Sequence, residues 1–240
     1  MKYLILADVH SNLEALEEVF EATKNFAFEK ILCVGDIVGY NANPNECIEL
    51  LRKKKNLIAL LGNHDAACVE MIGTENFSES AKECLEWTKK ELSEENKKWL
   101  QELPKFFSTK FLLAVHGTPN NPLSEYMDAE KAEKSLKQVA EDLILVGHNH
   151  KPFYFEEKEK TLTAIKEDKT IDFSGKRMVV SLPAVGQPRD ENKRTGFAVL
   201  DFNQQIMHVR RLSYNIKKAQ EKIFEAGLPR EMAERLEKGI

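Results

Sequence analysis

Short apolar runs alternate with amphipathic segments through the first half of the chain. Each run has the length of a single strand and ends abruptly at polar or glycine residues. The first three predicted strands are residues 3–7, 31–34 and 57–61. Between the first two, Leu13, Leu16 and Phe20 recur at helical spacing after a capping-box pattern at Ser11 and Glu14. Strands that alternate with short helices are typical of βαβ units and a parallel sheet.

The middle of the chain continues this alternation with longer helical segments. Asn43-Pro44 predicts a helix start, because proline suits the first helical position. Residues 78–103 are polar and helical in pattern, with Ser93 as an expected N-cap and Pro104 as the end. The further predictions are a strand at 111–115, a helix at 128–139 and a strand at 143–146.

The last third changes to closely spaced strand patterns separated by turn residues. The predicted strands are 153–155, 162–165, 171–173, 178–182, 196–200 and 206–209. This spacing predicts a second, largely antiparallel sheet. Two amphipathic helices, at 215–226 and 229–237, close the chain. No linker-like or repetitive tract interrupts the pattern, which indicates one domain over residues 1–240.

Composition narrows the class of protein. The 240 residues are 42% hydrophobic, and 35 basic against 39 acidic side chains give a net charge of −4. This balance offers no basic groove for long nucleic acid, and no apolar run approaches the ~20 residues of a membrane span. No signal peptide is expected, because Asp8 and His10 interrupt the first apolar stretch. The four cysteines form no C-x-x-C pair, so reduced thiols and a cytoplasmic location are expected.

Five of the predicted strands lead directly into a polar turn with potential metal ligands. These turns are Asp8-Val9-His10, Gly35-Asp36, Gly62-Asn63-His64-Asp65, His116-Gly117 and Gly147-His148-Asn149-His150. Any one of them alone is more typical of an ordinary structural role. Together they hold five of the six histidines, which chance placement does not explain. In an open parallel sheet, such turns meet at the carboxyl ends of the strands, where crevices form.

The residue types in these turns predict what is bound. Imidazole with carboxylate and amide oxygen suits Mn, Fe, Co, Ni or Zn, of which we favour manganese, and the lack of cysteine ligands argues against structural zinc. The candidate ligands are Asp8, His10, Asp36, Asn63, His116, His148 and His150. They exceed the needs of one ion, but with one shared carboxylate they supply four ligands to each of two. Two divalent ions would lower the pKa of a bridging water and attract an anionic substrate.

The order of these blocks resembles the calcineurin-like metallophosphoesterase superfamily, whose pattern is D-x-H, G-D, G-N-H-D/E, H and G-H-x-H. Residues 35–40 and 185–190 are similar to its small prokaryotic phosphoesterase branch. The resemblance implies an α/β fold, a four-layer α/β/β/α sandwich of two mixed sheets flanked by helices. It also implies hydrolysis of a phosphoester by attack of a metal-bridged hydroxide.

The resemblance assigns roles to individual residues. Asp8, His10, Asp36 and His150 would hold one ion, and Asp36, Asn63, His116 and His148 a second. His64 would not be a ligand but would protonate the leaving oxygen or stabilise the transition state, with Asp65 orienting its ring. Tyr40, Asn149 and Arg189 are the candidate substrate-binding residues.

Two features depart from the family pattern. The protein phosphatases of the family clamp a terminal phosphate with two arginines, but Val38-Gly39-Tyr40 and Leu61 occupy those neighbourhoods here. A dianionic monoester loses its usual clamp, which favours diesters. Where relatives in this branch have N-P-G-S, this chain has Ser181-Leu182-Pro183-Ala184, so a role for that asparagine is not carried over.

The leading hypothesis is therefore a phosphodiesterase acting on a small substrate such as a nucleotide. The alternatives on the same metals are a phosphomonoesterase, including a protein phosphatase, or a dinucleoside-polyphosphate hydrolase. A catalytically inert, protein-binding scaffold of the same fold is disfavoured, because such a module would have lost ligands or the His64 equivalent. The expected partner is a small phosphate ester, with no membrane and no long nucleic acid; the oligomeric state is left open.

Overall fold

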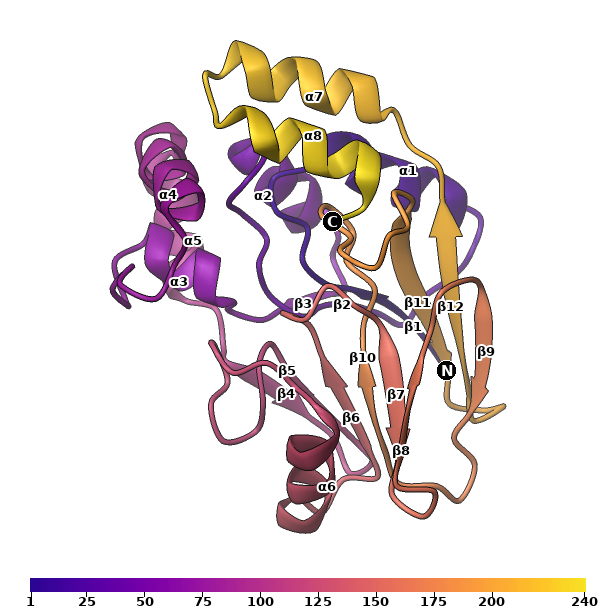
Figure 1. Ribbon diagram of the computed structural model, residues 1–240. Coiled ribbons are helices and arrows are strands. Elements are labelled where there is room, and N and C mark those ends of the chain that lie inside the picture. The colour runs from indigo at the N-terminus through magenta and orange to yellow at the C-terminus, as the bar shows by residue number, and fades with distance from the viewer.

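The computed structural model describes residues 1–240 as two six-stranded mixed sheets (Figure 1). The first sheet has the order β3 (Leu57–Ala59), β2 (Lys30–Cys33), β1 (Lys2–Leu6), β11 (Thr195–Asp201), β12 (Ile206–Leu212) and β9 (Lys169–Asp172). The second has the order β4 (Phe106–Ser108), β5 (Leu112–Val115), β6 (Leu143–Val146), β10 (Met178–Ser181), β7 (Phe153–Glu156) and β8 (Thr161–Ala164).

Eight helices accompany the sheets. They are α1 (Leu13–Thr23), α2 (Pro44–Arg52), α3 (Asn63–Cys68), α4 (Glu79–Glu91), α5 (Glu94–Gln101), α6 (Ala129–Gln138), α7 (Ile216–Glu225) and α8 (Arg230–Lys238). None of them is long and apolar enough to cross a membrane.

The two sheets pack face to face with helices outside both. Strand β1 shows how the pleat divides the core: Leu4 and Leu6 pack towards α1 and α2, whereas Tyr3 and Ile5 pack between the sheets. On the far side, α6 packs on the second sheet in a separate apolar cluster. The expected four-layer α/β/β/α sandwich is confirmed. Because both faces of the central strands are buried, their sequences are apolar runs without polar alternation.

Each sheet contains three neighbouring parallel strands. In the first sheet β1, β2 and β3 run parallel, and in the second β5, β6 and β10 do. This confirms the βαβ pattern predicted for the first half. The turns with the candidate ligands follow five of these six strands, so the site forms where the carboxyl ends of the two sets meet.

The prediction that the last third forms its own sheet is wrong. Strands β9, β11 and β12 join the first sheet, and β7, β8 and β10 join the second. Residues of β1 pair antiparallel with β11, with Leu4 opposite Val199. The alternation of apolar and polar residues identifies a strand, but partner choice depends on contacts far apart in sequence.

The N-terminus of α1 is capped by a different residue from the one predicted. Asn12, not Ser11, is the N-cap, and its side-chain oxygen accepts a hydrogen bond from the backbone N–H of Ala15. Ser11 has a left-handed backbone (φ 56°) and belongs to the preceding turn. The helix start predicted at Asn43-Pro44 and the N-cap predicted at Ser93 are confirmed for α2 and α5.

The C-terminal hairpin of α7 and α8 lies beside α1 and α2 on the outside of the first sheet (Figure 1). It forms an apolar cluster with α4 and with the loop after β2, in which Met232 and Leu236 are joined by Ala81, Cys84 and Tyr40. Elements from both ends of the chain thereby enclose one side of the site. All four cysteines are free and buried.

Candidate metal centre and substrate pocket

Five of the candidate ligands have an unusual backbone conformation. Their φ angles are positive although none is glycine: Asp8 (55°), His10 (46°), Asp36 (51°), His148 (63°) and His150 (55°). Residues with a side chain rarely adopt this left-handed region, and each instance costs of order 1 kcal/mol or more. The surrounding fold therefore holds these turns in a conformation that the local sequence does not prefer, as functional sites commonly do.

Two glycines leave the space that the site requires. A Cβ atom on Gly62 would lie 2.1 Å from Oδ1 of Asp36, and one on Gly39 would lie 2.6 Å from Nδ1 of His64. Gly39 also has a positive φ of 96°. Any larger residue at these positions would displace Asp36 or His64.

The structure gathers the candidate ligands into two overlapping clusters. The ligand atoms of Asp8, His10, Asp36 and His150 form one cluster, and those of Asp36, His116 and His148 form the other. Within each cluster the atoms lie within 4.8 Å of one another. Oδ2 of Asp36 lies 3.5 Å from Nε2 of His10 and 3.2 Å from Nε2 of His116, so this carboxylate is common to both.

Asn63 belongs with the second cluster. Its side-chain oxygen lies 3.1 Å from Nε2 of His116. Asn63 is also the first residue of α3, at the carboxyl end of β3. All seven predicted ligands are thus brought together, four of them around each half of the site with Asp36 shared.

The donor set fits divalent cations. Nδ1–H of His10, His116 and His150 donates to the backbone carbonyls of Val38, Val34 and Gln187 respectively. This orients Nε2 of each ring towards the ligand clusters. Nε2 of His10 and Nε2 of His150 consequently face each other at 3.0 Å as two lone pairs, an arrangement that a cation between them relieves.

Buried polar atoms without a hydrogen-bond partner also indicate a cation site. Buried side-chain atoms normally have a hydrogen-bond partner. Here Oδ2 of Asp8, Oδ2 of Asp36 and Nε2 of His148 are buried and have none. All three residues belong to the ligand clusters, Asp36 to both. Metal coordination would supply the missing interaction in each case.

Burial controls the charge of the site. It raises the pKa of Asp8 to about 7 and lowers the pKa of His148 to about 3. It also holds the pKa values of His10 and His150 well below their usual range. Burial opposes a charge on His116 too, but the contact with Asp36 outweighs it and raises the pKa to about 9. Three of the four histidines are thus neutral near pH 7, the form that binds metals.

His64 lies beside the clusters and is not part of either. Its ring packs against the rings of Tyr40, His10 and Phe77, with centroids 4.4, 4.8 and 5.0 Å away. Nδ1 has no hydrogen-bond partner, and burial lowers the pKa of the ring to about 4. The ring nevertheless lines the pocket above the clusters.

The prediction that Asp65 orients the His64 ring is wrong. Oδ1 of Asp65 accepts hydrogen bonds from the backbone N–H groups of Ile37 and Val38, at 2.8 and 3.0 Å. Oδ2 accepts one from the N–H of Gly62 at 3.0 Å. Asp65 therefore joins the turns after β2 and β3, while the aromatic neighbours hold the His64 ring.

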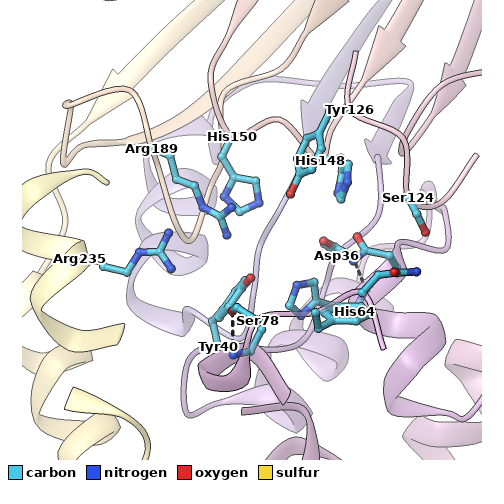
Figure 2. Close-up of a pocket in the computed structure, with 14 residues that line it drawn as sticks. Asp36, Tyr40, His64, Ser78, Ser124, Tyr126, His148, His150, Arg189 and Arg235 are labelled. Carbon is cyan, nitrogen blue, oxygen red and sulfur yellow. Dashed lines mark hydrogen bonds between the residues drawn. The ribbon is translucent and has the colours of Figure 1, made fainter. Parts of the chain in front are cut away.

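A pocket of about 280 Å³ opens above the ligand clusters. Tyr40 and Arg189, two of the three predicted substrate-binding residues, line it (Figure 2). Asn149 does not line the pocket. Its side-chain oxygen accepts a hydrogen bond from the N–H of Met127, and its side-chain NH₂ donates to the carbonyl of Met127, so Asn149 holds the loop before α6.

Sequence reasoning missed several of the residues that line this pocket. They include Ser78, Ser124, Tyr126 and Arg235 (Figure 2). The Tyr126 ring stacks on His148, with centroids 4.0 Å apart. None of these residues lies in a recognisable motif, and Arg235 comes from α8, far along the chain from every predicted ligand. Only the packing of the C-terminal hairpin beside Tyr40 identifies it.

Comparison with known proteins places the chain among phosphoesterases. A family model described as the calcineurin-like phosphoesterase superfamily domain matches residues 1–205. An uncharacterized protein of Methanocaldococcus jannaschii is 36% identical over 237 residues, which are 97% of this chain and 96% of that protein.

Solved structures agree over the full length. A metallophosphoesterase from Sphaerobacter thermophilus is 34% identical with a TM-score of 0.90, over 100% of this chain and 99% of that one. A hypothetical protein from Pyrococcus horikoshii is 22% identical with a TM-score of 0.81, over 100% and 98% of the two chains. At this identity, the Pyrococcus horikoshii structure shows only that the two chains share a fold.

Proposed function

The chain belongs to the calcineurin-like phosphoesterase superfamily, and from this premise we propose that it hydrolyses phosphodiester bonds in a small substrate, using two divalent metal ions. The observation that carries the proposal is the pair of ligand clusters that share Asp36 beneath an open pocket. A pair of ions that share a ligand is the arrangement of two-metal hydrolysis.

We assign the ligands as the two clusters divide them. Asp8, His10, Asp36 and His150 hold one ion, and Asp36, Asn63, His116 and His148 hold the other. When bound, two such cations activate a water molecule as the nucleophile and neutralise charge on the phosphate. Nitrogen, carboxylate and amide ligands without thiolate support manganese as the working metal.

The chain's own residues supply the rest of the chemistry. His64 lines the pocket without being a ligand, so its ring N–H is free to donate to the oxygen that leaves. Such donation offsets the negative charge that develops there in the transition state. Asp65 contributes indirectly, because its three hydrogen bonds fix the turns that carry Asp36 and His64.

The preference for diesters rests on the residues in the turns around Asp36 and His64. Val38 and Leu61 are fully buried apolar residues that do not line the pocket, and Gly39 has no side chain. These turns therefore place no arginine beside the metal clusters for the second negative charge of a monoester. A diester carries one negative charge, for which the two ions suffice.

A phosphomonoesterase is the second candidate, and Arg189 favours it. Its backbone N–H donates to the carbonyl of His150 at 3.2 Å, and its side chain lines the pocket. A guanidinium next to a ligand would stabilise a dianionic phosphate.

Rates on two substrates with the same leaving group separate the candidates. We expect the manganese-loaded protein to hydrolyse bis(p-nitrophenyl) phosphate with a higher kcat/KM than p-nitrophenyl phosphate. The same comparison with iron, cobalt, nickel and zinc identifies the best metal. Faster hydrolysis of the monoester would favour the second candidate, and no hydrolysis of either ester with any metal would contradict both.

A further inference from the structure

Two arginines lack the aspartate or glutamate partner that the others have, although Nε of Arg235 donates to an oxygen of the last residue, Ile240. Six of the chain's eight arginines have a carboxylate within 4.0 Å: Arg52, Arg177, Arg194, Arg210, Arg211 and Arg230. The exceptions are Arg189 and Arg235, and both line the pocket above the metal clusters. Both are partly buried. Like charges placed together in this way cost free energy unless an anion compensates them.

The two guanidinium groups lie on the same side of the pocket, and Arg189 is nearer to the ligand clusters than Arg235. Figure 2 shows Arg189 beside His150, with Arg235 beyond it. The backbone N–H of Arg189 donates to the carbonyl of His150 at 3.2 Å, so Arg189 lies next to a candidate ligand. Arg235 comes from α8 and lies on the other side of Arg189 from His150 in Figure 2.

Both side chains keep N–H donors beyond those in their hydrogen bonds to Gln187 and Ile240. Nε and Nη2 of Arg189 donate to Oε1 of Gln187, at 3.2 and 2.7 Å, and its guanidinium lies over the Tyr40 ring, 5.4 Å from the centroid. Nε of Arg235 donates to the backbone oxygen of Ile240 at 2.8 Å, which leaves both Nη groups. A fork of free N–H donors on a permanent charge matches the oxygens of a phosphate group.

Contacts within the protein hold the two segments that carry Arg189 and Arg235. Arg211, whose side chain is fully buried, pairs with Asp190, the residue after Arg189. The backbone N–H of Glu191 donates to the carbonyl of Gly239 at 2.8 Å, which ties the loop of Arg189 to the end of α8. Fixed donors bind an anion with less loss of side-chain entropy than flexible surface cations.

We propose that Arg189 and Arg235 bind a second phosphate group of the substrate, one that is not hydrolysed. The inference rests on the proposed function, in which the metal centre holds the reacting phosphate. Arg235 lies beyond Arg189 as seen from that centre, so the pair faces a group attached to the reacting phosphate and not that phosphate itself. The substrate class is then a small phosphodiester with an additional phosphate, such as a phosphorylated nucleotide.

The C-terminal hairpin becomes an element of specificity in this proposal. The family model ends at residue 205, whereas Arg235 lies in α8. The ligand clusters and His64 lie within the matched residues, and in this proposal α8 adds a contact to the part of the substrate that does not react.

A matched pair of diesters tests the proposal. The substrates are thymidine 5′-(4-nitrophenyl phosphate) and the same ester with a 3′-phosphate, which release the same leaving group. We expect the manganese-loaded protein to favour the 3′-phosphorylated ester by about tenfold or more in kcat/KM, mainly through KM, the effect of one or two charged hydrogen bonds. Arg235→Gln should bring this ratio close to one, and Arg235→Lys should restore part of it.

Arg230→Gln is the control, since Arg230 lies on the same helix, is 82% exposed and pairs with Glu234. Its ratio should equal that of the unaltered protein. A ratio near one in the unaltered protein, or an unchanged ratio in Arg235→Gln, would overturn the proposal.

A binding measurement keeps this test separate from the proposed function. If neither diester is hydrolysed, the proposed function fails, and calorimetry with thymidine 3′,5′-bisphosphate and thymidine 5′-monophosphate still decides on the subsite. Tighter binding of the bisphosphate that disappears in Arg235→Gln supports it. Equal affinities for the two compounds contradict it.

Discussion

Hydrogen bonds from Nδ1 to backbone carbonyls orient three of the histidines in the centre. The carbonyls belong to Val34, Val38 and Gln187, which lie in the turns after β2 and β10. The orientation of each ring thus depends on a backbone segment far from it in sequence. Side chains held in this way reach a metal ion with little loss of rotamer freedom.

Residue types and spacing were sufficient to predict the ligands, because each lies directly after a buried strand. They did not predict the contacts of Asp65 and Asn149 or the place of Arg235 in the pocket. The first two turn their oxygens to backbone N–H groups nearby, and their motif carries no sign of this. Arg235 reaches the pocket only through packing of α8 beside α4 and Tyr40.

His64 offers a test that separates catalysis from metal binding. His64→Ala should leave the metal content unchanged, because the ring belongs to neither ligand cluster. Hydrolysis of an ester with a poor leaving group should fall by about 10²–10⁴-fold, the usual contribution of a placed proton donor. The loss should be much smaller for nitrophenolate, which departs without a proton.

Metal analysis and rates on both leaving groups should be measured on one preparation of the variant. Loss of one ion would make His64 a ligand. Equal rate losses on both leaving groups, together with a lower free energy of unfolding, would indicate that His64 only stabilises the turn at Gly62.

Elements that are local in sequence were predicted well, and those that depend on distant partners were not. Helix α2 begins at Pro44, which suits the first helical position, and α5 begins after Ser93, whose side chain accepts from the N–H of Asn96. The last six strands were recognised but placed in one sheet, whereas three of them join β1, β2 and β3. Strand β4 and helix α3, with three and six residues, were missed because such short elements show no periodicity.

The N-terminus of α1 gives a prediction at this scale. Asn12 is 1% exposed, accepts from Ala15 N–H and donates to the carbonyl of Gly186 at 2.8 Å. Asn12→Ala removes the cap and leaves a buried carbonyl unpaired, so the free energy of unfolding should fall by about 2–4 kcal/mol. Urea unfolding in the presence of EDTA measures this without a contribution from bound metal.

Ser11→Ala is the matched control for this change. Ser11 is equally buried, but its hydroxyl has no hydrogen-bond partner, so the variant should change the free energy of unfolding by less than about 0.5 kcal/mol. A larger loss in Ser11→Ala than in Asn12→Ala would return the capping role to the residue that the capping-box pattern predicts.

At the scale of the whole molecule, the two sheets meet at the site, and the chain crosses between them repeatedly. The first cluster joins Asp8, His10 and Asp36 of the first sheet to His150 of the second, and the second cluster joins Asp36 to His116 and His148. Bound ions therefore cross-link the halves of the sandwich. Their binding also offsets the free-energy cost of the left-handed turns and of the facing nitrogens of His10 and His150.

This cross-link predicts a large effect of metal removal on stability. A ligand present at 100 times its Kd adds about 2.7 kcal/mol for each site to the folded state. For a chain of 240 residues, two such sites correspond to a rise in Tm of about 10–20 °C. The measurements are thermal unfolding with manganese and with EDTA, together with a metal content near two ions per chain.

Two variants show whether the effect comes from this centre. Asp36→Asn removes the charge that both clusters share, so the shift in Tm and the metal content should fall more than for any other ligand. His208→Ala alters the one histidine outside the strand-end turns, which lies on β12 with Nδ1 2.9 Å from the hydroxyl of Thr170, and should keep the full shift. A saturating content of one ion in the unaltered protein, or a full shift in Asp36→Asn, would mean that the two clusters do not act as one centre through Asp36.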